Sequence, residues 1–331
     1  MVNQLRVNRA PVILRIIFAL LFSFIYIFSP LCQMVLEDNP DIKEYLLIID
    51  SLLIGTHTDI EEGTFLEYLL NEPLWLYIMT LIGEFFYRPM DGLILVSFFC
   101  TTVITFFLCG RVNLFLASFF LYNPLVVDLL MAQVRSAFAA SLCLIALMIN
   151  KRLISLILVL IAFSVHSSMF IVFGVYSIAK FLESKRNSSN YKQLGITALF
   201  FGLVLGNTFG GGRAFLQDVT GDRRFTPPDP EHQSSLLFVS YWMLLAIALA
   251  LPFIQRYDDK IREYWTSYYS IVILSIPFIT TFYTMETIRF IPLCFPILLY
   301  SMYTYTAPVR ALLMGSMFVY QLVHYTYYIH T

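Results

Sequence analysis

The chain has 331 residues, of which 59% are hydrophobic and 13% are charged, and its formal net charge is −1. Because a soluble domain carries about 25% charged residues, this composition excludes an ordinary soluble domain and predicts an all-α polytopic membrane protein. The near-zero charge and the lack of a basic helix with interleaved aromatic residues exclude nucleic acid as a partner. The five cysteines stand alone in the sequence, without the paired spacing of a metal site or a disulfide framework.

Apolar runs that approach or exceed the length needed to cross about 30 Å of hydrocarbon predict the membrane helices. In chain order these runs are 11–31, 73–87, 92–109, 112–130, 136–150, 153–182, 194–209, 236–254, 266–283, 288–305 and 308–329. The run 153–182 is too long for one span, and the polar stretch Ser164-Val-His-Ser-Ser168 lies at its middle. We therefore expect two short helices that meet near His166.

Lysine and arginine mark the cytoplasmic side of a membrane protein. Four segments carry this charge: the N-terminus, Lys151-Arg152, 180–192 and 256–262. An acidic loop, 32–72, and a polar, proline-rich loop, 211–235, are then expected in the periplasm. If 112–130 crosses the membrane fully, Lys151-Arg152 falls on the periplasmic side, against the distribution of basic residues. However, Asn123-Pro124 interrupts that run, and proline removes a helix hydrogen bond. A broken or re-entrant element there gives about eleven crossings, with the N-terminus inside, the C-terminus outside and a single integral-membrane domain, 1–331.

Arginines inside apolar runs suggest a polar site. An arginine at the centre of a bilayer helix costs roughly 2.5–3.5 kcal/mol, so it is expected at a helix end or facing a polar cavity. Arg135 and Arg289 interrupt apolar runs in this way, and with the topology above they face the periplasm together with the loop 211–235. Guanidinium groups match phosphate oxygens. The predicted phosphate- and substrate-binding residues are Arg135, Arg289, Arg213, Arg223, Arg224 and Glu286.

Structural alternatives exist for these residues. Arg135 could reach the lipid headgroups from a helix boundary, and Glu286 could form an intrahelical ion pair with Arg289. Exposed loop arginines usually have no such specific role, and that alternative stays open for the loop 211–235.

Glu72 and His166 are the predicted choices for a catalytic acid or base. Glu72 directly precedes Pro73, which opens the second apolar run, and His166 lies between two short helices. A histidine works as a general base near neutral pH, whereas a carboxylate at a helix N-terminus can simply cap the helix. The sequence leaves the choice open. It contains no P-loop, nucleophile motif or metal-ligand spacing, so no metal or other cofactor is expected.

Four short motifs, spread over about residues 60–300, resemble those of the EpsG-type, Wzy-like polysaccharide polymerases. They are Glu72-Pro-Leu-Trp75, Gln133-Val-Arg-Ser-Ala137, Phe163-Ser-Val-His-Ser-Ser168 and Glu286-Thr-Ile-Arg289. The family pattern has a glutamine directly after the arginine and often a glycine after the proline, where this chain has Ser136 and Leu74.

The resemblance implies a GT-C-like glycosyltransferase of the bacterial inner membrane with its active site facing the periplasm. It would join undecaprenyl-pyrophosphate-linked repeat units into O-antigen, capsule or exopolysaccharide, with one lipid-linked glycan as donor and another as acceptor. Membrane lipid is a further expected partner. The resemblance also suggests a chain-length regulator protein as a partner.

Two other classes of function stay open from the residues alone. A flippase or transporter of lipid-linked oligosaccharide would also use arginines, but the polar groups are expected on one face, which favours an enzyme. A membrane O-acyltransferase would need a cytoplasmic histidine, whereas His166 is expected outside.

Overall fold

The computed structural model describes residues 11–55, 72–184, 191–212, 236–254, 263–283 and 290–330. Every regular element in these residues is a helix, as predicted, and none is a strand. The chain divides into two compact units, residues 1–169 and 170–331, and the boundary falls at the start of α11. That both units belong to one integral-membrane domain stays a prediction.

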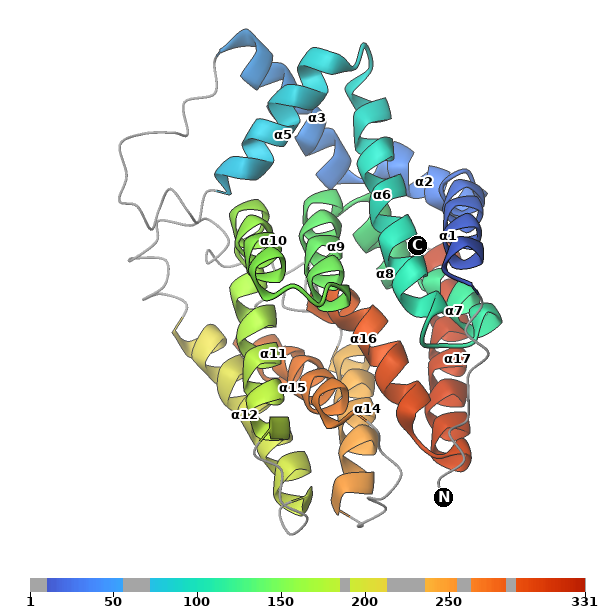
Figure 1. Cartoon of the computed structure of the whole chain (residues 1–331), viewed down its shortest axis with the longest axis vertical. Helices are drawn as coiled ribbons and strands as arrows, with labels where there is room; N and C mark the ends of the chain where they lie inside the picture. Colours follow the sequence, from blue (N-terminus) through green and yellow to red (C-terminus); the bar gives the residue numbers. More distant parts are fainter. Residues whose placement is uncertain are drawn as a thin grey trace. The chain divides into compact units, whose positions relative to one another are not determined.

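The first unit is built around one long helix (Figure 1). Its described helices are α1 (Val12–Ile27), α2 (Pro30–Asp38), α3 (Pro40–Ile54), α5 (Pro73–Phe85), α6 (Pro89–Cys109), α7 (Leu114–Leu121), α8 (Pro124–Met131), α9 (Val134–Met148) and α10 (Arg152–Val165). Helix α6 packs against α1, α5, α7, α8 and α9. Its buried Thr101 donates its hydroxyl to the carbonyl of Ser97 at 2.8 Å, which satisfies a polar group inside an apolar core.

Both breaks predicted within apolar runs are confirmed. Helices α7 and α8 are bent by 72°, and the Asn123 side chain accepts a hydrogen bond from the Leu125 amide at 3.1 Å, which caps α8. Pro124 occupies the first position of α8, where its missing N–H costs nothing. In the second run, α10 ends at Val165 and the next helix begins at Met169. The re-entrant course of 112–130 stays a prediction, because a bent pair also fits a broken span.

The segment 32–72, expected as an acidic loop, is helical in its described part. Pro30 and Pro40 each stand at the start of a helix, α2 and α3, because proline fixes the φ angle that a first helical residue needs. Asn39 between them caps α3 by accepting from the Asp41 amide at 2.9 Å. Residues 56–71 lie outside the described part, and the periplasmic location of this segment stays a prediction.

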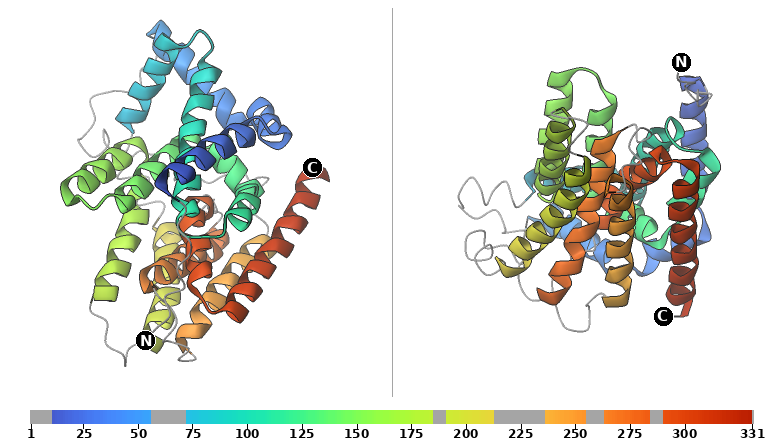
Figure 2. Two further views of the ribbon diagram at one scale, coloured as in Figure 1. Left: turned by 45° about the vertical axis from the view of Figure 1, so that its right-hand side comes forward. Right: turned by 90° about the horizontal axis from the view of Figure 1, so that it is seen from below.

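The second unit surrounds a helix that is buried on all sides. Its described elements are α11 (Met169–Ser184), α12 (Tyr191–Gly211), α14 (Leu236–Ile254), α15 (Tyr264–Thr280), η4 (Thr281–Tyr283), α16 (Phe290–Thr304) and α17 (Ala307–His330). Helices α12, α14 and α16 pack against α15, and Figure 2 shows α12, α14 and α15 side by side. A side chain at Gly202 of α12 would come within 2.6 Å of the Val272 carbonyl oxygen. Glycine there lets the two backbones approach closely, as in membrane helix packing.

Several helices have the length and composition of membrane spans. Among the described residues these are α6, α12 and α14, and the number rises from three to five if the bent pairs α1–α2 and α7–α8 each form one span. Helix α1 leaves apolar side chains such as Ile13 and Ile25 more than half exposed, which is typical of a lipid-facing surface. These findings agree with a helical membrane protein, and the number of about eleven crossings stays a prediction.

Candidate functional site

Glu72 is the centre of a polar cluster in the first unit. It precedes Pro73 at the start of α5, and its side chain is only 3% exposed. Its backbone is left-handed (φ 57°), which no other non-glycine residue in the described part of the chain adopts. Such a conformation costs roughly 1–2 kcal/mol. Sparsely populated backbone conformations of this kind concentrate at functional sites.

The break between α10 and α11 supplies most of the donors to this carboxylate. Nδ1 of His166 lies 2.7 Å from Oε1 of Glu72. The Ser167 amide and hydroxyl also donate to Oε1, at 3.0 and 3.2 Å. The amide of His166 still closes α10 on the Ala162 carbonyl. The polar interruption seen in the sequence therefore ends one helix and presents three donors to one oxygen.

Arg135 completes the cluster from the first turn of α9. Its Nη1 lies 2.5 Å from Oε2 of Glu72, and its side chain is 30% exposed. The ion pair balances the buried charge, because an unpaired buried carboxylate would be strongly unfavourable. Nε of Arg135 is buried and has no hydrogen-bond partner among the residues that the structure describes.

Two aromatic residues close the cluster on the side of α3 and α5. Tyr45 is buried, and its ring meets that of Trp75 edge to face at 5.7 Å. Burial raises the pKa of Tyr45 to about 12, although the Arg135 guanidinium opposes this rise. The phenol therefore keeps its proton, and the ion pair lies beside a neutral tyrosine.

This arrangement assigns different tasks to the two residues between which the sequence could not choose. An ionised carboxylate can only accept hydrogen bonds, so Nδ1 of His166 must carry a proton. In neutral His166 the lone pair then lies on Nε2, which is the basic nitrogen. Glu72 has both oxygens engaged by donors and is almost fully buried. The geometry therefore suits His166 as the base and Glu72 as the group that orients it.

A second set of hydrogen bonds beside the cluster was not anticipated from the sequence. Asp128 accepts from the side chain of Gln133 at 2.5 Å and from that of Asn39 at 3.2 Å. Gln133 stands two residues before Arg135, at the start of α9. A signal was present in the sequence, because Asp128 is a charged residue within an apolar run, and such residues face polar interiors.

The other predicted binding residues cannot be related to this cluster. Arg213, Arg223, Arg224, Glu286 and Arg289 all lie outside the described residues. The described part of the chain contains no group of three or more histidine, cysteine, aspartate or glutamate side chains that could hold a metal ion.

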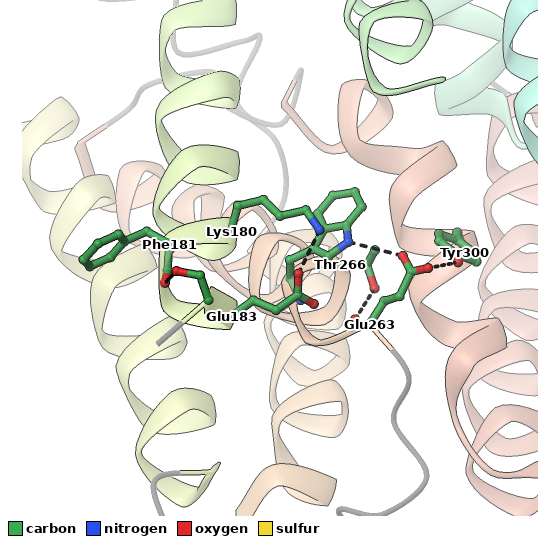
Figure 3. Close-up of polar contacts among 8 residues, drawn as sticks. Lys180, Phe181, Glu183, Glu263, Thr266 and Tyr300 are labelled. Carbon is green, nitrogen blue, oxygen red and sulfur yellow. Dashed lines mark hydrogen bonds and ion pairs between the residues drawn. The ribbon is translucent and has the colours of Figure 1, made fainter. Parts of the chain in front are cut away.

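The second unit has a polar cluster of its own, where α11, α15 and α16 meet (Figure 3). The carboxylate of Glu263 accepts from the Tyr300 hydroxyl at 2.6 Å and from the Trp265 indole at 3.2 Å. Glu183 pairs with Lys180 at 2.8 Å, and the Lys180 ammonium lies 4.7 Å from the centre of the Trp265 ring. Because each carboxylate is paired and Trp265 is buried, this cluster works as an anchor for the N-terminus of α15.

No family model, curated protein or solved structure matches this chain. The resemblance to polysaccharide polymerases therefore depends on the short sequence motifs alone.

Proposed function

We propose that this protein is a polysaccharide polymerase of the EpsG type, which joins undecaprenyl-pyrophosphate-linked repeat units on the periplasmic face of the bacterial inner membrane. The observation that carries the proposal is the contact of three separate motifs at one carboxylate. Glu72, Arg135 and His166 come from positions up to 94 residues apart, and all three are joined by hydrogen bonds or ion pairs within 2.7 Å.

The proposed reaction needs a base beside an acceptor hydroxyl. The hydroxyl oxygen of the acceptor sugar attacks the anomeric carbon of the donor glycan and forms the new glycosidic bond. The bond between that carbon and the carrier pyrophosphate breaks, and its electron pair leaves with the pyrophosphate. Nε2 of His166 takes the hydroxyl proton. Glu72 keeps the imidazole in the required tautomer and stabilises the positive charge that develops on it.

The pyrophosphate leaving group requires cations as it develops charge. Arg135 already forms an ion pair with Glu72. Its proposed role is to keep this ion pair and to contact the pyrophosphate of the substrate as well. The proposal assigns the remaining positive charge to Arg289, Arg213, Arg223 and Arg224, with Glu286 beside Arg289. A GT-C-like fold with about eleven crossings belongs to the same proposal.

Deletion of the gene in an encapsulated or O-antigen-bearing host separates this function from its alternatives. Loss of a polymerase leaves single repeat units on the surface. Loss of a flippase leaves no surface glycan, and loss of an O-acyltransferase leaves chains of normal length without acyl groups. Either of these two outcomes would contradict the proposal.

A reconstituted assay tests the assigned roles. Purified protein with lipid-linked repeat units from the deletion strain should elongate them, and His166→Ala should slow elongation by at least about 100-fold, as expected for a lost acid–base group. Glu72→Gln should lower kcat strongly while repeat-unit binding is kept. The control is Glu44→Gln, because Glu44 is an exposed carboxylate on α3. Elongation by both variants within a few-fold of the parent would contradict the assignment.

A further inference from the structure

The side-chain amide of Gln133 is held in one orientation by Asp128. Oδ2 of Asp128 lies 2.5 Å from Nε2 of Gln133, while Oδ1 accepts from Asn39 at 3.2 Å. The backbone amide of Gln133 also donates to the carbonyl of Asp128 at 2.9 Å. Since an ionised carboxylate has no hydrogen to donate, Gln133 must turn its NH₂ group toward Asp128 and its carbonyl oxygen away.

This orientation leaves a buried acceptor with nothing to accept. Gln133 is 7% exposed, and its Oε1 atom has no hydrogen-bond partner among the residues described. Leaving such an atom unpaired is unfavourable. Nε of Arg135, two residues further along the same helical turn, is a buried donor that also lacks a partner in this part of the chain. The start of α9 therefore holds one buried acceptor and one buried donor that have no partner among the described residues.

The polarity of these two atoms selects the ligand. A diphosphate that links the lipid to the sugar is fully ionised near neutral pH and has only acceptor oxygens, so it would meet repulsion at the Gln133 carbonyl. A sugar hydroxyl or acetamido N–H donates to such an oxygen, and sugar oxygens accept from an arginine. Carbohydrate-binding sites need hydrogen-bonding groups placed in this way, because unpaired buried polar groups then reject the wrong ligand.

We propose that Gln133 binds the glycan rather than the pyrophosphate, by accepting a hydrogen bond from a donor group of the sugar, and that Asp128 is the positioning residue that sets this polarity. The inference rests on the proposed function, and it names the glycan as the part of the substrate that contacts the start of α9.

Exchange of the polar groups tests the proposal through the apparent KM for lipid-linked single repeat units. In Asp128→Asn, the new side-chain NH₂ can donate to Gln133, which turns the glutamine amide over and presents a donor to the sugar. We expect the KM to rise about 10-fold or more, as for a lost hydrogen bond, with kcat within about three-fold. Gln133→Met, which keeps the length of the side chain and removes its acceptor, should have the same effect.

The double variant Asp128→Asn/Gln133→Glu provides the rescue. Asparagine at 128 then donates to one carboxylate oxygen at 133, the other oxygen is an acceptor like the original, and the net charge is unchanged. We expect its KM to return to within about three-fold of the parent value, an interaction that a double-mutant cycle isolates. Asp91→Asn is the control, since it removes an exposed carboxylate at the start of α6, and its KM should equal that of the parent.

The possible results separate this inference from the proposed function. If the parent protein elongates repeat units and Asp128→Asn leaves the KM unchanged, the inference about Gln133 is wrong and the proposed function stands. Equal losses of kcat and stability without rescue in the double variant would reduce Asp128 to a purely structural role. If the parent itself does not elongate, the proposed function fails first.

Discussion

At the scale of single residues, Glu72 combines burial, charge and a left-handed backbone, and each of these is unfavourable alone. At least four donors compensate the carboxylate: one from Arg135, one from His166 and two from Ser167. The neighbouring contacts thus fix the carboxylate in one position. A carboxylate held in this way can orient an imidazole without approaching the substrate itself.

The ion pair between Glu72 and Arg135 gives a prediction for the stability of the protein. Arg135→Ala leaves a buried carboxylate without its cation, so the free energy of unfolding in detergent should fall by about 2–4 kcal/mol. This value is at the lower side for buried pairs, because the Arg135 side chain is 30% exposed. Chemical denaturation of the purified variant measures it. Unchanged stability would mean that the pair contributes little.

A charge-free double variant is the matched comparison for that experiment. Arg135→Met/Glu72→Gln removes both charges, so it should regain most of the lost stability. Its rate of glycan elongation should still be strongly lowered, because the carboxylate that is proposed to orient His166 is gone. Recovery of elongation as well would show that neither charge is needed for the reaction.

The sequence located Glu72, Arg135 and His166 because each interrupts or bounds an apolar run, where a polar group requires a reason. It could not choose the base, since that choice depends on the hydrogen bond between Glu72 and His166, which are 94 positions apart. Asp128 was not among the predicted site residues, because the break at Asn123-Pro124 dominates the sequence pattern of its run. Its pairing with Gln133 depends on the turn between α8 and α9, which no residue pattern specifies.

At the scale of elements, the break between α10 and α11 positions three donors of the Glu72 cluster. Proline and polar residues allowed the breaks at 123–124 and 166–168 to be predicted, because they weaken the local helix directly. The helices α2 and α3 within the segment 32–72 were not predicted. The acidic composition of that segment suggested a loop, whereas Pro30 and Pro40 each stand at the first position of a helix.

The anchor at the N-terminus of α15 gives a prediction for the second unit. Glu263→Ala leaves the Tyr300 hydroxyl and the Trp265 indole without their common acceptor (Figure 3), so the free energy of unfolding should fall by roughly 1–3 kcal/mol. Thermal or chemical unfolding in detergent measures the change. Glu44→Gln is the control, because it removes an exposed carboxylate of the first unit, and such surface changes usually stay within about 0.5 kcal/mol. An equal effect of the two variants would argue against a specific anchor.

At the scale of the whole molecule, each unit has its own central helix, α6 in the first and α15 in the second. All the contacts of the Glu72 cluster lie within the first unit. The first unit therefore contains all the contacts among the proposed base His166, the proposed orienting carboxylate Glu72 and Arg135. The course of the chain through the membrane in this unit decides which side of the membrane the cluster faces.

The bent pair α7–α8 determines that course, and two exposed positions can test it. If 112–130 enters and leaves on one side, a single crossing by α6 and a single crossing by α9 separate Arg88 from Lys151, so both lie in the same compartment. If the pair crosses fully, they lie in opposite compartments.

Both residues are exposed, and neither side chain caps its helix, so Arg88→Cys and Lys151→Cys should fold normally. In a background without the five free native cysteines, we expect a membrane-impermeant thiol reagent to label both only after permeabilisation of spheroplasts. Glu44→Cys, on the exposed side of α3, should react in intact spheroplasts and serves as the opposite-side control. Labelling of Lys151→Cys together with Glu44→Cys, and apart from Arg88→Cys, would mean that 112–130 crosses the membrane and that the proposed orientation of the Glu72 cluster is wrong.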